Sequence, residues 1–276
     1  MTIDSSEILR HFVQLPQLRV TSAPYFQNFE FSAEPVGKNP FPFPKDGVLG
    51  KQAEACFEAY LKQSEAFQLL AANLQIHTSP PSLSNPSERK TLGELDFIVR
   101  NLKTGEVVHI ELACKFFLYE ENINGLEAKK WIGPNRKDSL FKKLEKLRQK
   151  QFPLLNTPET LQKLETLGIP KPSSQQLCLK GFLFIPKKMG RESFPINIQD
   201  CIVGHYIKPS EFKAEETAQY AIPSKKEWLL PIRTFPEWLS FSEIKPLIDA
   251  QLSLKKSPLI YKKTPQKVER FFITWW

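Results

Sequence analysis

Several features that assign a chain to a special class are missing from this sequence of 276 residues. No window reaches the roughly 18 consecutive apolar residues of a membrane-spanning helix, so we expect no membrane partner. The N-terminal sequence MTIDSSEILRHF lacks the basic and apolar regions of a signal peptide. No internal repeat is found either. Together these absences predict a cytoplasmic protein.

Metal-binding and disulfide patterns are missing as well. The four histidines are dispersed and form no HExxH or comparable metal-ligand spacing. The four cysteines form no CxxC pair, and three of them sit inside apolar stretches; they are Cys56, Cys114, Cys178 and Cys201. We therefore expect buried free thiols in a reducing compartment rather than disulfides or a zinc site.

Glycine is scarce, with 11 residues, whereas proline is abundant, with 23, so we expect many extended connections broken by proline. The hydrophobic share of 41% and the charged share of 25% are ordinary for a globular protein and exclude a disordered, collagen-like or heptad-dominated chain. The length fits one large domain or two small ones. Lysine and arginine number 38 against 30 acidic residues, and the net charge of +8 points only weakly to a polyanionic partner.

The periodicity of the apolar residues predicts an α/β fold whose central sheet of mixed direction is flanked by helices. The core is expected over residues 47–185. Its elements, in chain order, are a helix over 47–66, strands over 67–77, 91–100 and 106–119, a helix over 136–152 and a strand over 177–185.

The segments on either side of this core are less regular in sequence. Residues 1–46 are expected to be an irregular segment packed on the core, with a short helix near 8–13. Residues 186–276 are expected to form a β-rich, aromatic extension of the same domain. Within it we expect a helix near 241–252 and a final strand near 268–275.

Two neighbouring strands carry the most informative pattern, because Asn101 to Gly105 between them favour a hairpin turn. If Asn101 pairs with Glu106, Asp96 lies directly opposite Glu111. Directly opposed side chains are about 5 Å apart at Cβ, so two carboxylates there repel each other and do not stabilise the sheet. A divalent cation would turn that repulsion into a binding site, since hard oxygen ligands suit Mg²⁺ or Mn²⁺.

Strand alternation places further charged residues beside this pair. On the first strand Glu94 is expected to share a face with Asp96, while Leu95 belongs to the apolar face. On the second strand Lys115 is expected to share a face with Glu111. A lysine beside acidic metal ligands can orient a water molecule or neutralise the charge of a developing phosphorane. The alternative is a solvent-facing hairpin with ordinary alternating charges, but the strongly apolar opposite faces argue against it.

The stretch GELDF at 93–97, followed by HIELACKFFL at 109–118, resembles an uncharacterised bacterial family known only as a domain of unknown function. That family is placed by comparison in the PD-(D/E)XK, or restriction-endonuclease-like, superfamily of nucleases. The resemblance covers about residues 45–185, with a weaker similarity at 270–273. Further matching stretches are 49–54, 131–135 with Asp138, and 143–151. It implies a restriction-endonuclease-like core with the C-terminal residues as an extension.

The resemblance also implies roles for individual residues. Asp96 resembles the metal-binding aspartate of the motif, Glu111 its second acidic residue and Lys115 its lysine. Glu54 resembles the additional acidic ligand that many members place on the first core helix. The sequence departs from the motif at two points. Leu95 stands where the motif has proline, and Lys115 follows Glu111 by four residues rather than two, about 6.6 Å further along the strand.

The expected helix over 136–152 is strongly basic and follows the hairpin directly. In the fold that the resemblance implies, this helix packs beside the active cleft, and its basic residues become candidates for salt-dependent, sequence-independent contacts with phosphates. These candidates are Lys142, Lys143, Lys146, Arg148 and Lys150. The alternative is a solvated helix face. Gln151 resembles a glutamine found near the site in some superfamily members, and Asn135 is expected to cap the helix; with Glu94 they are candidate supporting residues.

The resulting prediction is a metal-dependent, nuclease-like protein that hydrolyses phosphodiester bonds in nucleic acid, with DNA preferred over RNA as partner. Mg²⁺ or Mn²⁺ would be held by Asp96, Glu111 and Glu54, and Lys115 would assist the attacking water. The displaced lysine leaves open an alternative, a catalytically degenerate nucleic-acid-binding module on the same fold. A third possibility is a protein-interaction scaffold that works through its aromatic C-terminal part.

Overall fold

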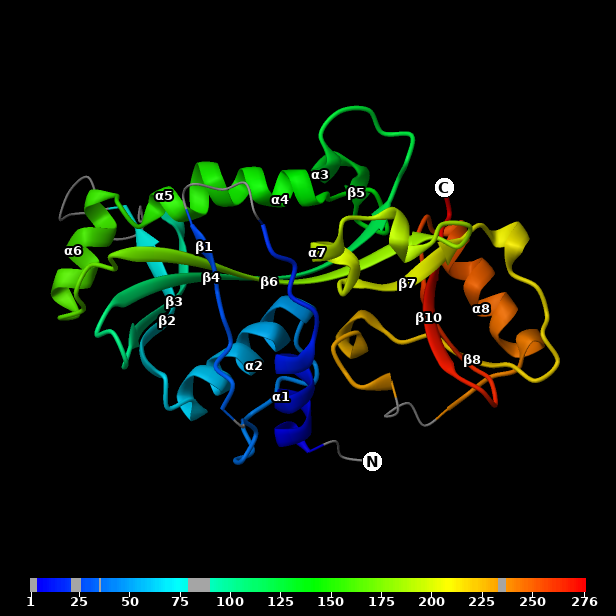
Figure 1. The fold of residues 1–276 in the computed structure, drawn as a ribbon, viewed down its shortest axis with the longest axis horizontal. Helices are drawn as coiled ribbons and strands as arrows, with labels where there is room; N and C mark the ends of the chain where they lie inside the picture. Colours follow the sequence, from blue (N-terminus) through cyan, green and yellow to red (C-terminus); the bar gives the residue numbers. More distant parts are fainter. Residues whose placement is uncertain (1–3, 21–25, 35, 79–89, 233–236) are drawn as a thin grey trace.

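The computed structural model describes residues 4–20, 26–34, 36–78, 90–232 and 237–276, whose strands build one mixed sheet (Figure 1). Within these residues the sheet has ten strands, and its main order is β2-β3-β4-β6-β7-β10-β9-β8. These eight strands are β2 (Phe67–His77), β3 (Thr91–Asn101), β4 (Val107–Tyr119), β6 (Ser174–Pro186), β7 (Ile202–Ile207), β8 (Gln219–Ala221), β9 (Leu259–Lys263) and β10 (Val268–Ile273). The short β1 (Gln27–Asn28) pairs with β6, and β5 (Trp131–Ile132) pairs with β4. The expected α/β fold with a sheet of mixed direction is confirmed.

The middle of the sheet is parallel and its two sides are antiparallel. β4, β6, β7 and β10 run in the same direction, whereas β2-β3-β4 and β10-β9-β8 are antiparallel. β6 lies near the centre and is buried from Leu177 to Ile185. Strands that are covered on both faces have continuous apolar sequences, which explains why the run LCLKGFLFI correctly predicted a buried strand.

Helices cover both faces of the sheet (Figure 1). On one face lie α1 (Ser5–Gln14) and α2 (Leu49–Gln63). On the other face α4 (Leu140–Lys146) continues into the π-helical segment η2 (Leu147–Gln151) and α5 (Phe152–Leu154). α8 (Phe241–Ser253) packs on the C-terminal strands. The remaining helical segments are α3 (Glu127–Lys130), α6 (Pro158–Thr166), α7 (Ile196–Gln199), η3 (Arg191–Ser193), η4 (Pro209–Glu211) and η5 (Lys225–Glu227). No helix among the described residues is both long and apolar enough to cross a membrane.

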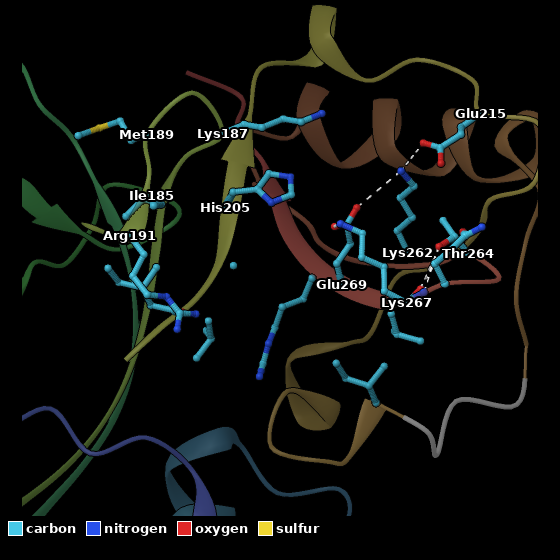
Figure 2. A pocket seen from close by; sticks show the side chains of 17 residues that line it. Ile185, Lys187, Met189, Arg191, His205, Glu215, Lys262, Thr264, Lys267 and Glu269 are labelled. Atoms are coloured by element: carbon cyan, nitrogen blue, oxygen red, sulfur yellow. Dashed lines mark hydrogen bonds and ion pairs between the residues drawn. The ribbon is translucent and has the colours of Figure 1, made fainter. Parts of the chain in front are cut away.

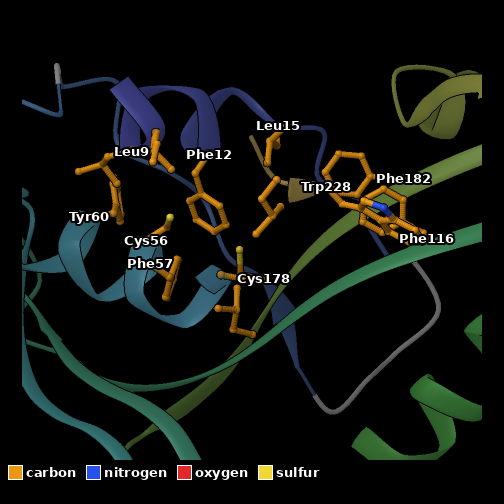
Figure 3. Close-up of a cluster of buried hydrophobic side chains, with 14 of the residues drawn as sticks. Leu9, Phe12, Leu15, Cys56, Phe57, Tyr60, Phe116, Cys178, Phe182 and Trp228 are labelled. Atoms are coloured by element: carbon orange, nitrogen blue, oxygen red, sulfur yellow. The ribbon is translucent and has the colours of Figure 1, made fainter. Parts of the chain in front are cut away.

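Aromatic side chains fill the layer between α1, α2 and the sheet (Figure 3). Phe57 of α2 meets Phe97 of β3 edge to face with ring centroids 5.0 Å apart, and Phe116 of β4 stacks on Phe182 of β6 at 4.3 Å. The four cysteines are free, as expected, and three of them are fully buried. Burial raises the pKa of the Cys178 thiol to about 12, so it behaves as a small apolar side chain.

The β3–β4 hairpin has the register that its turn predicts. Phe97 pairs with Ile110 and Arg100 with Val107, which confirms the alignment that places Asn101 against Glu106. The Asn101 side chain accepts hydrogen bonds from the N–H groups of the next turn residues, as asparagine does in tight turns. Gly105 has a φ of +74°, a conformation that glycine adopts without steric cost.

The basic helix begins later than expected. Its first helical residue is Leu140, and Ser139 is the N-cap, accepting a hydrogen bond from the N–H of Lys142 at 3.2 Å. The expectation that Asn135 caps the helix is therefore wrong. Arg136 has a φ of +58°, and this left-handed conformation keeps residues 133–138 in a loop, because helical residues have negative φ.

The N-terminal segment is fixed to the sheet by a buried lysine. Lys180 of β6 is 1% exposed, and its ammonium donates hydrogen bonds to the carbonyls of Val13 and Leu15 at the C-terminal end of α1, at 3.1 and 2.9 Å. It also lies 4.1 Å from the centroid of the Phe31 ring. Cations are favoured at helix C-termini and over aromatic rings. Burial nevertheless lowers the pKa of Lys180 to about 8.

This lowered pKa gives the first prediction. The unfolded chain binds a proton at Lys180 up to about pH 10.5, whereas the folded chain releases it near pH 8, so the group makes the folded state more stable as pH rises between these values. We expect the free energy of unfolding of wild type, relative to Lys180→Met, to increase between about pH 7 and about pH 10. Urea unfolding of both proteins at both pH values measures this difference in free energy. A difference that does not change with pH would contradict the prediction.

Candidate active site

The backbone pairing between β3 and β4 stops where Asp96 would meet Glu111. The last described pair is Phe97 with Ile110. Beyond it the N–H of Leu112 donates a hydrogen bond of 2.8 Å to Oδ2 of Asp96. The side chain of Asp96 thus takes the place of a main-chain acceptor, and the two strands separate at this point. Asp96 and Glu111 are therefore in the predicted register, but they lie where β3 and β4 are no longer paired.

The alternation of β3 is also interrupted at Asp96. Phe97 packs on α2, whereas Leu95 packs with Ile98 in the cluster under α5 and α6. Glu94 consequently lies on the α2 side, 4.0 Å from the ammonium of Lys51. The expectation that Glu94 and Asp96 share one face, with Leu95 and Phe97 on the other, is wrong, because the two-residue period of β3 is interrupted between Leu95 and Phe97.

The backbone of β2, which pairs with β3 on its other side, is distorted beside Asp96. Its pairing with β3 includes Ala72 with Phe97 and Leu74 with Leu95, so Asn73 lies level with Asp96. Asn73 has a φ of +51°, an uncommon conformation for a residue inside a strand. Residues held in such conformations concentrate at functional sites. Sequence periodicity gave no signal for this distortion.

Glu111 is fully buried and held by two side-chain hydrogen bonds. His109 Nε2 lies 3.1 Å from Glu111 Oε1, and the amide of Gln151 donates to Oε2. Gln175 Nε2, which can only donate, lies 3.0 Å from His109 Nδ1. The network therefore assigns the histidine proton to Nε2, from which it is donated to Glu111. Each carboxylate oxygen of Glu111 keeps a further lone pair.

Lys143 of α4 is the cation that faces both carboxylates. Its ammonium donates a hydrogen bond of 3.0 Å to Oε1 of Gln151, which links it to Glu111. Burial lowers the pKa of Lys143, while the charges of Glu111 and Asp96 oppose that shift. Gln151 stands at the end of the π-helical segment. The wider i→i+5 turn of such a segment helps to bring Gln151 to the side of the helix where Lys143 lies.

Asp96 is the least compensated charge of the group. Burial and the neighbouring charge of Glu111 raise its pKa to about 8, and the Leu112 N–H and Lys143 only partly offset them. A metal-free carboxylate with such a pKa is still largely protonated at neutral pH. Two carboxylates that share one partly buried site behave in this way.

Lys115 lies on the expected face of β4, since Ala113 and Phe117 on either side of it pack toward α4, but its ion-pair partner is not one of the predicted carboxylates. Its ammonium forms an ion pair of 2.5 Å with Asp138, and both side chains are about one-third exposed, at 36% and 37%. No hydrogen bond or ion pair joins Lys115 to Asp96 or Glu111 among the described residues. The four-residue spacing along β4 therefore brings this lysine to the loop before α4, which is fixed by the Asp138 contact.

Glu54 of α2 lies on the other side of Asp96. It forms an ion pair of 2.6 Å with Lys51, and the Asn73 amide, turned with its nitrogen toward the carboxylates, donates to Glu54 at 2.9 Å and to Glu94 at 3.2 Å. The charge of Glu54 contributes to the raised pKa of Asp96. Glu54 and Glu94 thus form a second acidic group that adjoins Asp96.

The remaining predicted residues lie outside this group. Four basic residues of α4 and η2 are exposed; they are Lys142, Lys146, Arg148 and Lys150. Arg148 pairs with Glu145 at 2.9 Å. Asn135 accepts a hydrogen bond from the N–H of Ser257 at 2.9 Å and so links the loop before α4 to the C-terminal part. Sequence reasoning missed the roles of His109, Gln175 and Asn73; of these only His109 had a signal, its place on the face of Glu111.

No three His, Cys, Asp or Glu side chains come together as a metal-binding group among the residues that the structure describes. The arrangement instead offers two carboxylates with free lone pairs, one cation and a basic helix face.

Comparison with protein families gives one finding. A family described as Domain of unknown function (DUF1853) matches residues 38–273. This match covers the hairpin, the basic helix and the C-terminal strands together. Comparison with curated proteins and with solved structures gives no match.

The electrostatics of Asp96 lead to the second prediction. Its pKa is raised from 3.8 to about 8, so the folded state binds a proton that the unfolded chain has released, and this group makes the protein less stable as pH rises between these values. Without metal, Asp96→Asn should stabilise the protein by about 1–3 kcal/mol near pH 8 and have little effect near pH 4. Urea unfolding with a chelator present measures both. Destabilisation near pH 8 would contradict the assignment.

Proposed function

The chain belongs to this family of domains of unknown function, and because that description names no activity, we propose from the geometry that the protein is a metal-dependent phosphodiesterase acting on nucleic acid. The observation that carries the proposal is the Asp96–Glu111 carboxylate pair in the gap between β3 and β4, faced by Lys143. Such a hairpin, with a helix packed over it, is the arrangement expected of a restriction-endonuclease-like core.

The donor chemistry fits Mg²⁺ or Mn²⁺. Mg²⁺ keeps several waters and is commonly bound by one or two carboxylates together with substrate phosphates, so a closed protein cage is not required. Asp96 accepts one hydrogen bond, from Leu112, and its raised pKa marks a charge that a cation would stabilise. Asp96 and Glu111 would hold the ion, and Glu54 would be the additional carboxylate ligand. When bound, the ion polarises the scissile phosphate and lowers the pKa of a bound water.

The surrounding side chains orient this pair and supply positive charge. His109 and Gln151 fix both oxygens of Glu111, so its lone pairs point in set directions. Lys143 is placed to neutralise charge that develops on the phosphate as water attacks phosphorus and a sugar oxygen leaves. In this proposal Lys143, from the helix, takes the role that the sequence motif gave to Lys115.

The positive charge of the helix over the hairpin indicates the class of substrate. Lys142, Lys146 and Lys150 are exposed on the same helix that carries Lys143, and basic residues in such a row contact phosphates without reading the bases. DNA is the expected substrate, with RNA as the second possibility to be assayed.

The third prediction is the effect of single substitutions on cleavage. With Mg²⁺ or Mn²⁺ present, we expect wild type to cleave DNA, and we expect Asp96→Asn, Glu111→Gln and Lys143→Met each to lower the rate by about 100-fold or more. Lys115→Met should cost less than about tenfold, since its partner is Asp138. Cleavage of labelled single- and double-stranded DNA and of RNA measures these rates, with chelator as the blank.

Lys163→Met is the matched control, because Lys163 is an exposed lysine of α6 and its loss removes one charge without touching the hairpin. The variant with the lower cleavage rate, Lys143→Met or Lys115→Met, shows which of the two lysines takes part in catalysis. No cleavage by folded wild type with either ion would refute the hydrolytic proposal.

A non-catalytic nucleic-acid-binding module is the second candidate, favoured by one observation: Lys115 is bound to Asp138 rather than to the carboxylates. This module and the nuclease share the basic helix face, so binding without cleavage distinguishes them.

The fourth prediction concerns that shared surface. The logarithm of the affinity for duplex DNA should fall linearly with the logarithm of the salt concentration, with a slope of about −0.9 per phosphate contact. Changing Lys142, Lys146 and Lys150 together to glutamine should make the slope shallower by about 2–3. Fluorescence anisotropy with chelator measures it. An unchanged slope would remove this helix face from the interface.

A further inference from the structure

A large cavity lies away from the hairpin, between the end of β6 and the strands β7, β9 and β10 (Figure 2). Its volume is about 920 Å³, within the range of small-molecule sites in proteins. In Figure 2, Ile185, Met189 and Arg191 line one side, and Glu215, Lys262 and Thr264 line the other. The cavity uses none of the residues of the candidate active site.

The lining carries an excess of positive charge. Among the described lining residues five basic side chains face two carboxylates; the basic ones are Lys187, Arg191, Lys262, Lys267 and Arg270. Both carboxylates are already paired: Glu215 with Lys262, and Glu269 with Lys267 at 2.7 Å and with Lys262 at 3.6 Å. No described carboxylate pairs with the other three basic residues, so about three positive charges are left for a ligand.

Arg270 is the most informative of these three. Its guanidinium lies 5.8 Å from the centroid of the Phe182 ring, and burial lowers its pKa. Its guanidinium forms no hydrogen bond or ion pair with a described residue, and the Tyr261 side chain opposes the lowering of its pKa. Burying a charged group without a partner is costly. Arg270 also lines an adjoining cavity of about 500 Å³ beside α1, and the residue is only half-buried.

The cavity also has an apolar side. Ile185, Ile202 and Val203 line it together with Ile232. Arg191, across from the basic strands, already donates one hydrogen bond of 2.9 Å to the carbonyl of Ile202 and retains further donors. A ligand that suits this lining carries several negative charges at one end and an uncharged body at the other.

We propose that this cavity binds a small organic diphosphate, with the phosphates at Arg270 and Arg191 and the uncharged part against the apolar side. A diphosphate ester has about three negative charges near neutral pH, which matches the unpaired charge of the lining. Arginine binds phosphate oxygens through two parallel N–H groups. The site is independent of the proposed hydrolysis, because it shares no residue with the hairpin.

Binding of ADP, with pyrophosphate and adenosine as probes of its two parts, tests this proposal. Isothermal titration calorimetry is carried out at physiological salt with chelator, so that the carboxylates hold no metal. ADP should bind more tightly than pyrophosphate, and adenosine at least about tenfold more weakly than ADP. Arg270→Gln and Arg191→Gln should each weaken ADP binding at least about tenfold. Lys163→Gln, which removes an exposed lysine of α6, should change nothing.

Two further measurements distinguish binding in this cavity from binding at the hairpin and from a folding defect. Asp96→Asn should bind ADP as wild type does; loss of binding in that variant would place ADP at the hairpin and overturn the proposal. Without ligand, Arg270→Gln should show a single cooperative unfolding transition near that of wild type, which shows that weaker binding is not caused by misfolding. No ADP binding at millimolar concentration, or binding by both arginine variants equal to that of wild type, would refute the site.

Discussion

The hydrogen bond from the Leu112 N–H to the Asp96 carboxylate is the contact on which the candidate site depends. A side chain here replaces a main-chain acceptor, so β3 and β4 separate just beyond Phe97 while staying in register below it. The gap allows Asp96 to lie near Glu111 without the two side chains being stacked on one face of a continuous ladder. Glu94 lies on the α2 side, near Lys51, while Lys143 and Gln151 lie on the α4 side.

The two carboxylates differ in how many hydrogen bonds compensate for their burial. Glu111 is fully buried but held by His109 and Gln151, and Gln175 fixes the histidine in turn. Among the described residues Asp96 has one hydrogen-bond donor, the Leu112 N–H, and its burial beside a like charge raises its pKa. A chain selected only for stability would pair or remove such a group. In the proposed function a cation would take the place of the proton on Asp96, because stability is commonly sacrificed at functional sites.

The sequence predicted the parts of the fold that local patterns determine. The strands over 67–77 and 106–119, the hairpin register and the buried strand over 177–185 follow from alternation, turn chemistry and continuous apolar runs. The predictions failed where a tertiary contact overrides the pattern. The predicted face of Glu94 was wrong because the period of β3 is interrupted beside the left-handed Asn73 of β2. The predicted helix start was wrong because Ser139, not Asn135, is the cap.

The contacts of Lys115 and Lys143 differ in a way that spacing along one strand does not predict. Spacing along β4 measures how far Lys115 is from Glu111, but the proposed function needs only that a positive charge lie near both carboxylates. A helix packed over the hairpin can meet it equally well. The buried side chains of Leu147 and Phe152 fix that helix on the sheet, and the π-helical segment directs Gln151 to Lys143 and Glu111. Packing, rather than spacing, therefore selects the lysine that faces the acidic pair.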